Sequence, residues 1–185
     1  MANTSENINL GSYNTFSNLA DYPYECIKAL INNDEMIWKL LKHNTADAWN
    51  ATDLSYSEKV SLIYNGADNT TDFRVFMEQG QPDVNTFENC QIRVSNHSVY
   101  PENRAIGTVS MVIEVYSHYK TNHLSNYKTR NDVVMQRMLE VLNGRNIDSL
   151  GRLYFDRLAG ESNRLESGGQ LPYKGKWAIL STKAG

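Results

Sequence analysis

A stretch of alternating residues, TVSMVIEVYSHY at positions 108–119, limits most strongly what this chain can fold into. The alternate positions on one side of an extended backbone are all apolar: Val109, Met111, Ile113 and Val115. The positions between them include serine, glutamate and tyrosine. Alternation of this length, rich in β-branched and aromatic residues, predicts a long strand with one buried face.

Shorter patterns around this strand predict further elements. We expect helices near residues 21–31, with Asp21 as cap, and near 36–41, separated by the NND at 32–34. Ser55 and Glu58 have capping-box spacing for a third short helix before Gly66. The strongest helical pattern spans 127–142 and ends at Gly144. The other expected strands are 72–78, 90–95, 150–158 and 176–182, the last two as a hairpin, with loops at 96–104 and 160–175.

These elements predict an α+β fold. We expect a mostly antiparallel sheet of about five strands, with the N-terminal helices and one long helix packed on one face. At 185 residues the chain has the size of one domain, so we assign residues 1–20 to a flexible N-terminal arm and 21–185 to a single α+β domain. We expect no membrane span and no signal peptide. Cys26 and Cys90 are expected to be reduced and buried.

The net charge of −3 conceals an asymmetry along the chain. Up to Glu102 there are 14 acidic and 6 basic residues, and from Asn103 onward there are 7 acidic and 12 basic, giving balances of −8 and +5. Such a division could reflect nucleic-acid contact through the basic part, or head-to-tail contact between identical subunits.

Enzyme motifs give little support for catalysis. No glycine-rich nucleotide-binding motif is present, and we expect no cofactor. The sharpest enzyme hypothesis is a metal-dependent nuclease, since Pro82-Asp83 followed by Glu114 on a strand resembles the proline–aspartate nucleases. Tyr116 stands where that pattern has lysine, and Asp83 is equally explained as a turn residue. The spacing of His118 and His123 does not favour zinc, so we expect no metal.

Nucleic-acid binding is a further hypothesis. Basic and aromatic residues gather around the last predicted helix and could follow a phosphate backbone without sequence specificity. A solvated helix face explains the same pattern. The residues are Lys120, Lys128, Arg130, Arg137, Arg145 and Arg152, with Tyr119 and Tyr127.

The order of elements resembles a family of structural proteins. The resemblance covers roughly residues 21–182 and runs through DFRVFMEQGQPD, NRAIGTVSMVIEVYSHY and RNDVVMQRMLEVLNGRNIDSLGRLYF. The N-terminal YECIKALINNDEMIWKLLKHN, with short helices before the sheet, is similar as well. Together these segments look like the head–tail connector, neck and tail-terminator proteins of tailed bacteriophages.

That resemblance implies a structural protein without an active site. Such proteins form homo-oligomeric rings between the portal and the tail, and double-stranded DNA passes through the ring without sequence-specific contact. The implied partners are copies of the chain itself, a portal or adjoining neck protein, and a tail-tube or tail protein, with no membrane. The implied location is the neck of the virion, after synthesis in the host cytoplasm. We favour a neck ring over a tail terminator because the N-terminal helical part is substantial.

Candidate interface residues follow from this interpretation. Arg130, Arg137 and Arg145 lie on or beside the last predicted helix and could face a neighbouring subunit or the lumen. The loop with His97, Tyr100 and Pro101 and the loop with Gly168 and Gly169 are candidate contacts with the rings above or below.

Overall fold

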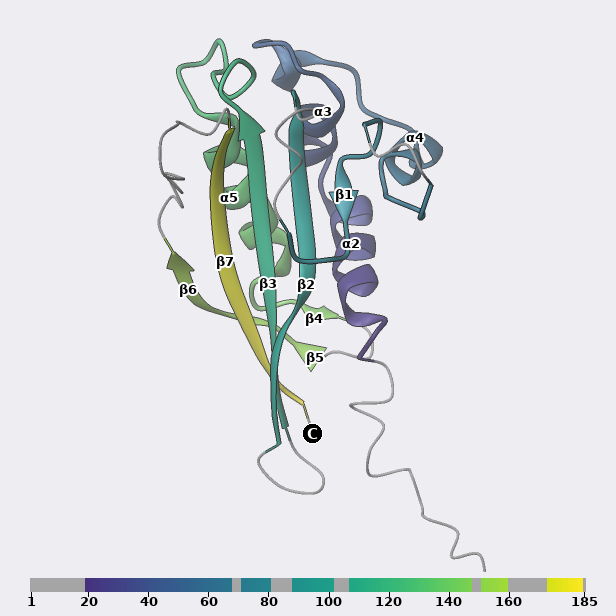
Figure 1. Ribbon diagram of the computed structural model, residues 1–185, viewed down its shortest axis with the longest axis vertical. Helices are drawn as coiled ribbons and strands as arrows, with labels where there is room; N and C mark the ends of the chain where they lie inside the picture. Colours follow the sequence, from purple (N-terminus) through teal and green to yellow (C-terminus); the bar gives the residue numbers. More distant parts are fainter. Residues whose placement is uncertain are drawn as a thin grey trace, which may run out of the picture.

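A computed structural model of the chain describes residues 19–67, 71–80, 88–101, 107–147, 151–159 and 173–184 (Figure 1). The helices in this part of the chain are α2 (Tyr22–Asn33), α3 (Met36–Lys42), the short 3-10 helix η2 (Ala48–Asn50), α4 (Tyr56–Ser61) and α5 (Arg130–Leu142). The strands are β1 (Val75–Phe76), β2 (Cys90–Pro101), β3 (Gly107–His118), β4 (Asn146–Ile147), β5 (Gly151–Arg152), β6 (Tyr154–Ala159) and β7 (Tyr173–Ala184).

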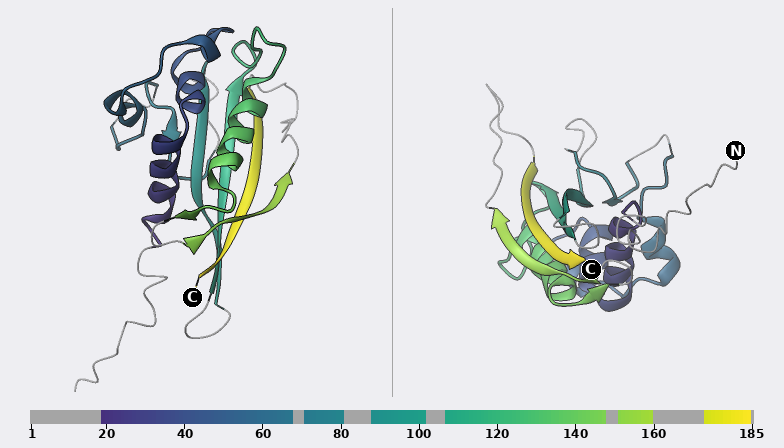
Figure 2. Two further views of the ribbon diagram at one scale, coloured as in Figure 1. Left: turned by 180° about the vertical axis from the view of Figure 1, so that it is seen from behind. Right: turned by 90° about the horizontal axis from the view of Figure 1, so that it is seen from below.

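Five of these strands form one sheet in the order β1-β2-β3-β7-β6. β1 runs parallel to β2, and the other neighbours are antiparallel. β4 and β5 form a separate two-stranded ribbon. Helices α2, α3 and α5 pack on one face of the sheet, α2 and α3 over β2 and α5 over β3 and β7 (Figure 2). The α+β class, the mostly antiparallel sheet and the packed helices are confirmed.

The core lies between this sheet face and the helices. The four alternating apolar residues of β3, from Val109 to Val115, are fully buried, as predicted. Trp38 of α3 and Met138 of α5 are among the helix residues that pack in the same cluster. Each such side chain contributes about 1.5–3 kcal/mol by leaving water.

The opposite face of β3 is less exposed than expected. Ser110 and Tyr116 are buried although they point away from the helices. The ring of Tyr116 packs edge-on against that of Tyr173 on β7, with centroids 5.6 Å apart, and Ser110 shares a 2.8 Å hydrogen bond with Ser181. β3 is therefore a central strand shielded on both faces along most of its length.

Strand boundaries differ from the predictions in several places. The expected loop from 96 onward is wrong for residues 96–101, because β2 continues to Pro101 and pairs with β3 down to Gly107, with a bulge between Asn96 and Ser98. The expected strand at 72–78 contains only the two residues of β1. The expected strand at 150–158 divides into β5 and β6 around Leu153. The antiparallel pairing of β6 with β7 confirms the predicted hairpin.

The helix signals were more reliable. The capping box of Ser55 and Glu58 is present, and α2 gives way to α3 at the predicted break. α5 begins three residues later than expected, after Thr129, whose side chain accepts a hydrogen bond from the Asp132 N–H. Asp21 occupies the N-cap position of α2 without a side-chain cap bond.

The remaining expectations concern the two cysteines, the N-terminal arm, the second loop and membrane spans. Cys26 and Cys90 are free and buried, as predicted. Most of the expected N-terminal arm and residues 160–172 of the second expected loop lie outside the described residues. Residues 173–175, expected in that loop, belong to β7 instead. Among the helices of the described residues, none is long and apolar enough to span a membrane.

Candidate assembly surfaces

Arg130 was predicted to face a neighbour or a lumen, and that prediction is wrong. Its side chain is fully buried at the start of α5. The guanidinium donates to the carbonyl oxygens of Thr121 at 2.7 Å, His43 at 2.7 Å and Thr45 at 2.8 Å, and also to that of Leu40. Burial lowers its pKa. Arg130 is a structural residue that joins α5 to the end of α3 and the segment after it.

Arg137 links α5 to the corner between α2 and α3. Its Nε and Nη2 lie 2.7 and 2.6 Å from Oδ2 of the buried Asp34, and its Nη1 lies 2.9 Å from Glu140. Asp34 Oδ1 also accepts a 2.7 Å hydrogen bond from the N–H of Ile37 at the start of α3. The Arg137 side chain is half-exposed, but its charge is already paired within the chain.

Arg145 is the candidate arginine that stays on the surface. It precedes β4, and its carbonyl oxygen accepts from the Leu153 N–H at 3.2 Å. Arg152 on β5 pairs with Asn146, the neighbour of Arg145 in the sequence, and is also exposed. Within the described part of the chain neither guanidinium forms an ion pair.

The candidate contacts on the β2–β3 hairpin lie in strand rather than in loop. His97 is exposed at the bulge of β2, and Tyr100 is exposed near its end. Pro101 is the last residue of β2, opposite Gly107. Gly168 and Gly169 lie outside the described residues.

Of the two carboxylates of the nuclease hypothesis, Asp83 lies outside the described residues. Glu114 lies on the sheet face away from the helices, opposite Arg93 of β2, and accepts a 2.9 Å hydrogen bond from the Tyr116 hydroxyl. Burial raises the pKa of Glu114. No group of three or more His, Cys, Asp or Glu side chains in the described ranges could hold a metal ion. Glu114 is therefore part of a polar cluster on the sheet rather than of a described metal site.

The order of strands in the sheet separates the acidic part of the chain from the basic part. β1 and β2 come from the acidic part of the chain, and β3, β7 and β6 from the basic part, so the boundary falls between β2 and β3. The helices follow the same division, with α2 and α3 against β2 and α5 against β3 and β7. The two lateral ends of the molecule are α4 on the acidic side and β6 on the basic side (Figure 1).

A groove runs along α5 on the basic side. It has a volume of about 370 Å³ and is lined by Met135, Gln136, Leu139, Glu140 and Asn143 of α5 and by Lys176 of β7. Lys176 forms an ion pair with Asp132, which also lies beside the groove. We call this surface the α5 groove. It adjoins β6, since the Phe155 N–H donates to the Asn143 side chain at 2.8 Å.

β6 is the last strand of the sheet, so one of its edges has no neighbour among the described strands. Tyr154 and Phe155 at its start are 55% and 41% exposed. An open edge with exposed aromatic residues is a surface on which another chain can add.

A small apolar surface lies at the other lateral end. Tyr56 and Val60, one turn apart on α4, are 62% and 39% exposed. We call these two residues the α4 patch. Spacing i, i+4 places both on one side of the helix, so they form a continuous apolar strip.

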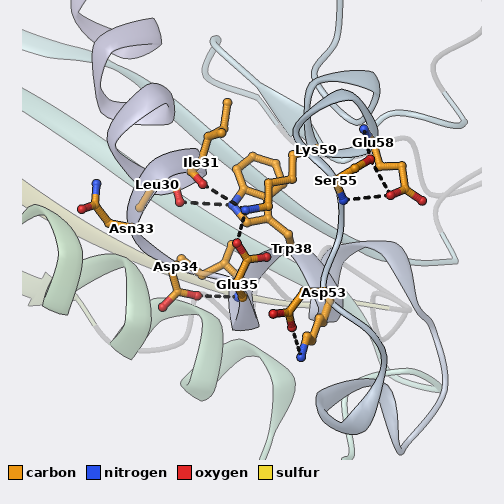
Figure 3. A network of polar contacts seen from close by, with 12 residues as sticks. Leu30, Ile31, Asn33, Asp34, Glu35, Trp38, Asp53, Ser55, Glu58 and Lys59 are labelled. Atoms are coloured by element: carbon orange, nitrogen blue, oxygen red, sulfur yellow. Dashed lines mark hydrogen bonds and ion pairs between the residues drawn. The ribbon is translucent and has the colours of Figure 1, made fainter.

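α4 is held firmly against α2 and α3 (Figure 3). The buried Lys59 donates to the Ile31 carbonyl oxygen at 3.0 Å and pairs with Glu35. Lys39 of α3 pairs with Asp53 just before α4 at 2.5 Å. The α4 patch is therefore presented on a fixed support.

Sequence reasoning missed both surfaces. Tyr56 and Val60 could have been found from the capping box, which fixes the helical phase and places them together. The α5 groove had no comparable signal, because it depends on how far α5 lies from β6. The sequence alone does not specify that separation.

Comparison with known proteins identifies a family. A search of curated proteins finds no match to the chain. A family model described as YomW matches residues 34–167, which include α3, α4, α5 and strands β1 to β6. Since this match covers well over half of the chain, the protein belongs to the YomW family.

Proposed function

We propose that this protein is a structural subunit that forms a ring in the neck of a tailed bacteriophage. In this role it joins the portal to the tail, and its ring encloses the path of double-stranded DNA. The proposal combines the resemblance of residues 21–182 to connector proteins with one structural observation. That observation is the division of the sheet into an acidic and a basic side.

The charge division favours a ring for a geometric reason. The two ends of this sheet lie on opposite sides of the molecule, so complementary surfaces at these ends can meet when two copies associate. A contact between two different surfaces is heterologous, and it closes into a ring when the rotation between subunits allows. Opposite net charges of the two sides also suit assembly, because complementary charge increases the association rate.

The experiment that tests this role is localisation in particles. The chain carries an epitope tag, and gold-labelled antibody is imaged by electron microscopy in lysates of the cells that produce it. We expect label at the capsid–tail junction. Label on the end of tails without capsids would instead support a tail terminator, and particles without label would overturn the proposal.

A further inference from the structure

We infer that the α4 patch of one copy docks in the α5 groove of the next copy. This inference deepens the proposed ring function and rests on it for the presence of a second copy. It names the two surfaces that meet and the side chains at the centre of the contact.

The helical layer of the molecule is incomplete on the basic side. α5 covers β3 and β7, whereas β6 extends beyond it (Figure 2). Phe155 on β6 points to the same side of the sheet as the core residue Leu180, yet it remains 41% exposed. The place beside α5 is therefore one where a further helix could pack on the sheet.

The α5 groove has the lining that such a helix requires. The half-buried Leu139 and the edge of Met135, which is only 3% exposed, supply its apolar surface, and Gln136 and Glu140 form its polar rim. Its volume of about 370 Å³ is sufficient for a few side chains rather than for a whole domain. Grooves of this kind bind a helix through side chains spaced i, i+4.

The α4 patch supplies that spacing. Tyr56 and Val60 are the exposed apolar residues of a short helix, and the contacts of Lys59 hold the helix in place. A preorganised anchor loses little conformational entropy on binding. Aromatic residues such as tyrosine are common at the centres of protein interfaces.

Charge favours docking between copies in this orientation. Glu58 is exposed beside the α4 patch, whereas the nearby Asp53 is already paired with Lys39 of its own chain. Lys174 is exposed on β7, two residues from Lys176 of the groove, and within the described residues it forms no ion pair. Docking of α4 on α5 therefore brings the Glu58 carboxylate towards an available cation.

The occupant is a second copy because the two surfaces lie at opposite lateral ends of one molecule (Figure 1). α4 is anchored to its own α2 and α3, so it cannot reach its own α5 groove. The contact joins two different surfaces, and each added subunit exposes the same pair again. Repetition of this contact builds a ring or an open chain of subunits.

Engineered cysteines test the contact directly, because Cys26 and Cys90 are both buried. A chain with Val60→Cys and Gln136→Cys is oxidised at high concentration after purification, and also within the producing cells. We expect a ladder of disulfide-linked oligomers on a non-reducing gel. Adding Leu139→Glu, which places a carboxylate in the groove, should abolish the ladder.

Three controls define the orientation. The single variants Val60→Cys and Gln136→Cys should run as monomers on the non-reducing gel, since a heterologous contact does not bring the same residue of two copies together. Val60→Cys combined with Tyr24→Cys should also form no disulfide-linked oligomers on this gel, because Tyr24 is exposed on the acidic side together with α4. A dimer of the single Val60→Cys variant would indicate a two-fold contact and overturn the inference.

The remaining outcomes separate this inference from the proposed function. Absence of the ladder both in purified protein and in cells overturns the docking, even if gold label lies at the capsid–tail junction. A ladder in cells whose particles carry no label supports the docking and overturns the role in the neck.

Discussion

At the scale of single residues, two buried cations hold the helical layer together. Arg130 donates to the carbonyl oxygens of Leu40 and His43 at the end of α3, where helix carbonyls lack partners within the helix. Lys59 does the same for Ile31 in the last turn of α2. A positive charge at a helix C-terminus is also favourable for the helix dipole. The basic residues of this chain are thus partly structural, which charge counts alone do not reveal.

Replacement of Arg130 tests this structural role. Arg130→Met removes the donors of several buried carbonyl groups, so we expect the free energy of unfolding to fall by about 3 kcal/mol. Arg130→Lys should recover only part of this loss, since lysine lacks the planar fork of donors. Urea denaturation measures both effects. The exposed Arg145→Ala is the matched control, and an equal loss for Arg145→Ala would contradict the assignment.

The buried cysteines lead to a second prediction at this scale. Burial raises the pKa of the Cys26 thiol to about 12, and burial also raises that of Cys90. The thiolate is the reactive form, so neither residue should react with a thiol reagent at pH 8 in the folded chain. Both should react after denaturation. Rapid labelling of the native protein would show that one of these thiols is accessible.

Glu114 and Glu58 should show opposite pH dependence. Burial raises the pKa of Glu114, so the folded chain holds this proton more tightly than the unfolded chain does. Stability is lost as pH rises from the ordinary glutamate pKa to the raised one. Hydrogen bonds from Ser55 lower the pKa of Glu58, so its contribution is present above the ordinary pKa and lost as pH falls.

Glutamine variants separate these two contributions. Glu114→Gln should become more stable relative to the parent chain as pH rises. Glu58→Gln should become less stable relative to it over the same range. Denaturation curves at a series of pH values compare each variant with the parent, and trends of the same sign would contradict this account.

At the scale of elements, the clearest predictions came from regular patterns. The alternation of Val109 to Val115 was sufficient to predict β3, and the capping box of Ser55 and Glu58 correctly predicted the start of α4. The second half of β2 was missed because Asn96 and His97 are poor strand formers. Pairing with β3 determines the structure there, since strand preference depends strongly on neighbouring strands.

Two glycines provide a matched test of element boundaries. Gly144 follows α5 with φ of +75°, and a Cβ there would meet no atom within 4 Å. Gly151 at the start of β5 has φ of +86°, and its Cβ would lie 3.3 Å from Thr182 Oγ1. Gly144→Ala should therefore cost about 1–2 kcal/mol, from the left-handed backbone alone. Gly151→Ala should lower the stability more than Gly144→Ala does, because its Cβ also crowds Thr182. Thermal unfolding of both variants measures the two losses, and a larger loss for Gly144→Ala would contradict this account.

At the scale of the whole molecule, the sequence predicts the sign of the net charge of each half of the chain, but not where each half lies in the fold. With a different strand order, strands from the acidic part and from the basic part of the chain would alternate in the sheet. The boundary between the two parts lies instead between β2 and β3, because β7 and β6 add beside β3 and not beside β1. The α5 groove and the open edge of β6 could not be predicted for the same reason. They depend on which strand lies at the edge and how far the helical layer extends.

Mixing two defective variants tests head-to-tail assembly in solution. Val60→Asp places a charge in the α4 patch, and Leu139→Glu places one in the α5 groove. Each variant retains one intact surface, so neither should oligomerise alone. An equimolar mixture should form a heterodimer, since the intact patch of the Leu139→Glu chain fits the intact groove of the Val60→Asp chain. Light scattering measures the masses, and circular dichroism confirms that both variants are folded. Because only one such contact can form in the mixture, growth beyond the dimer would reveal a second assembly surface, and a mixture of monomers would exclude this pairing.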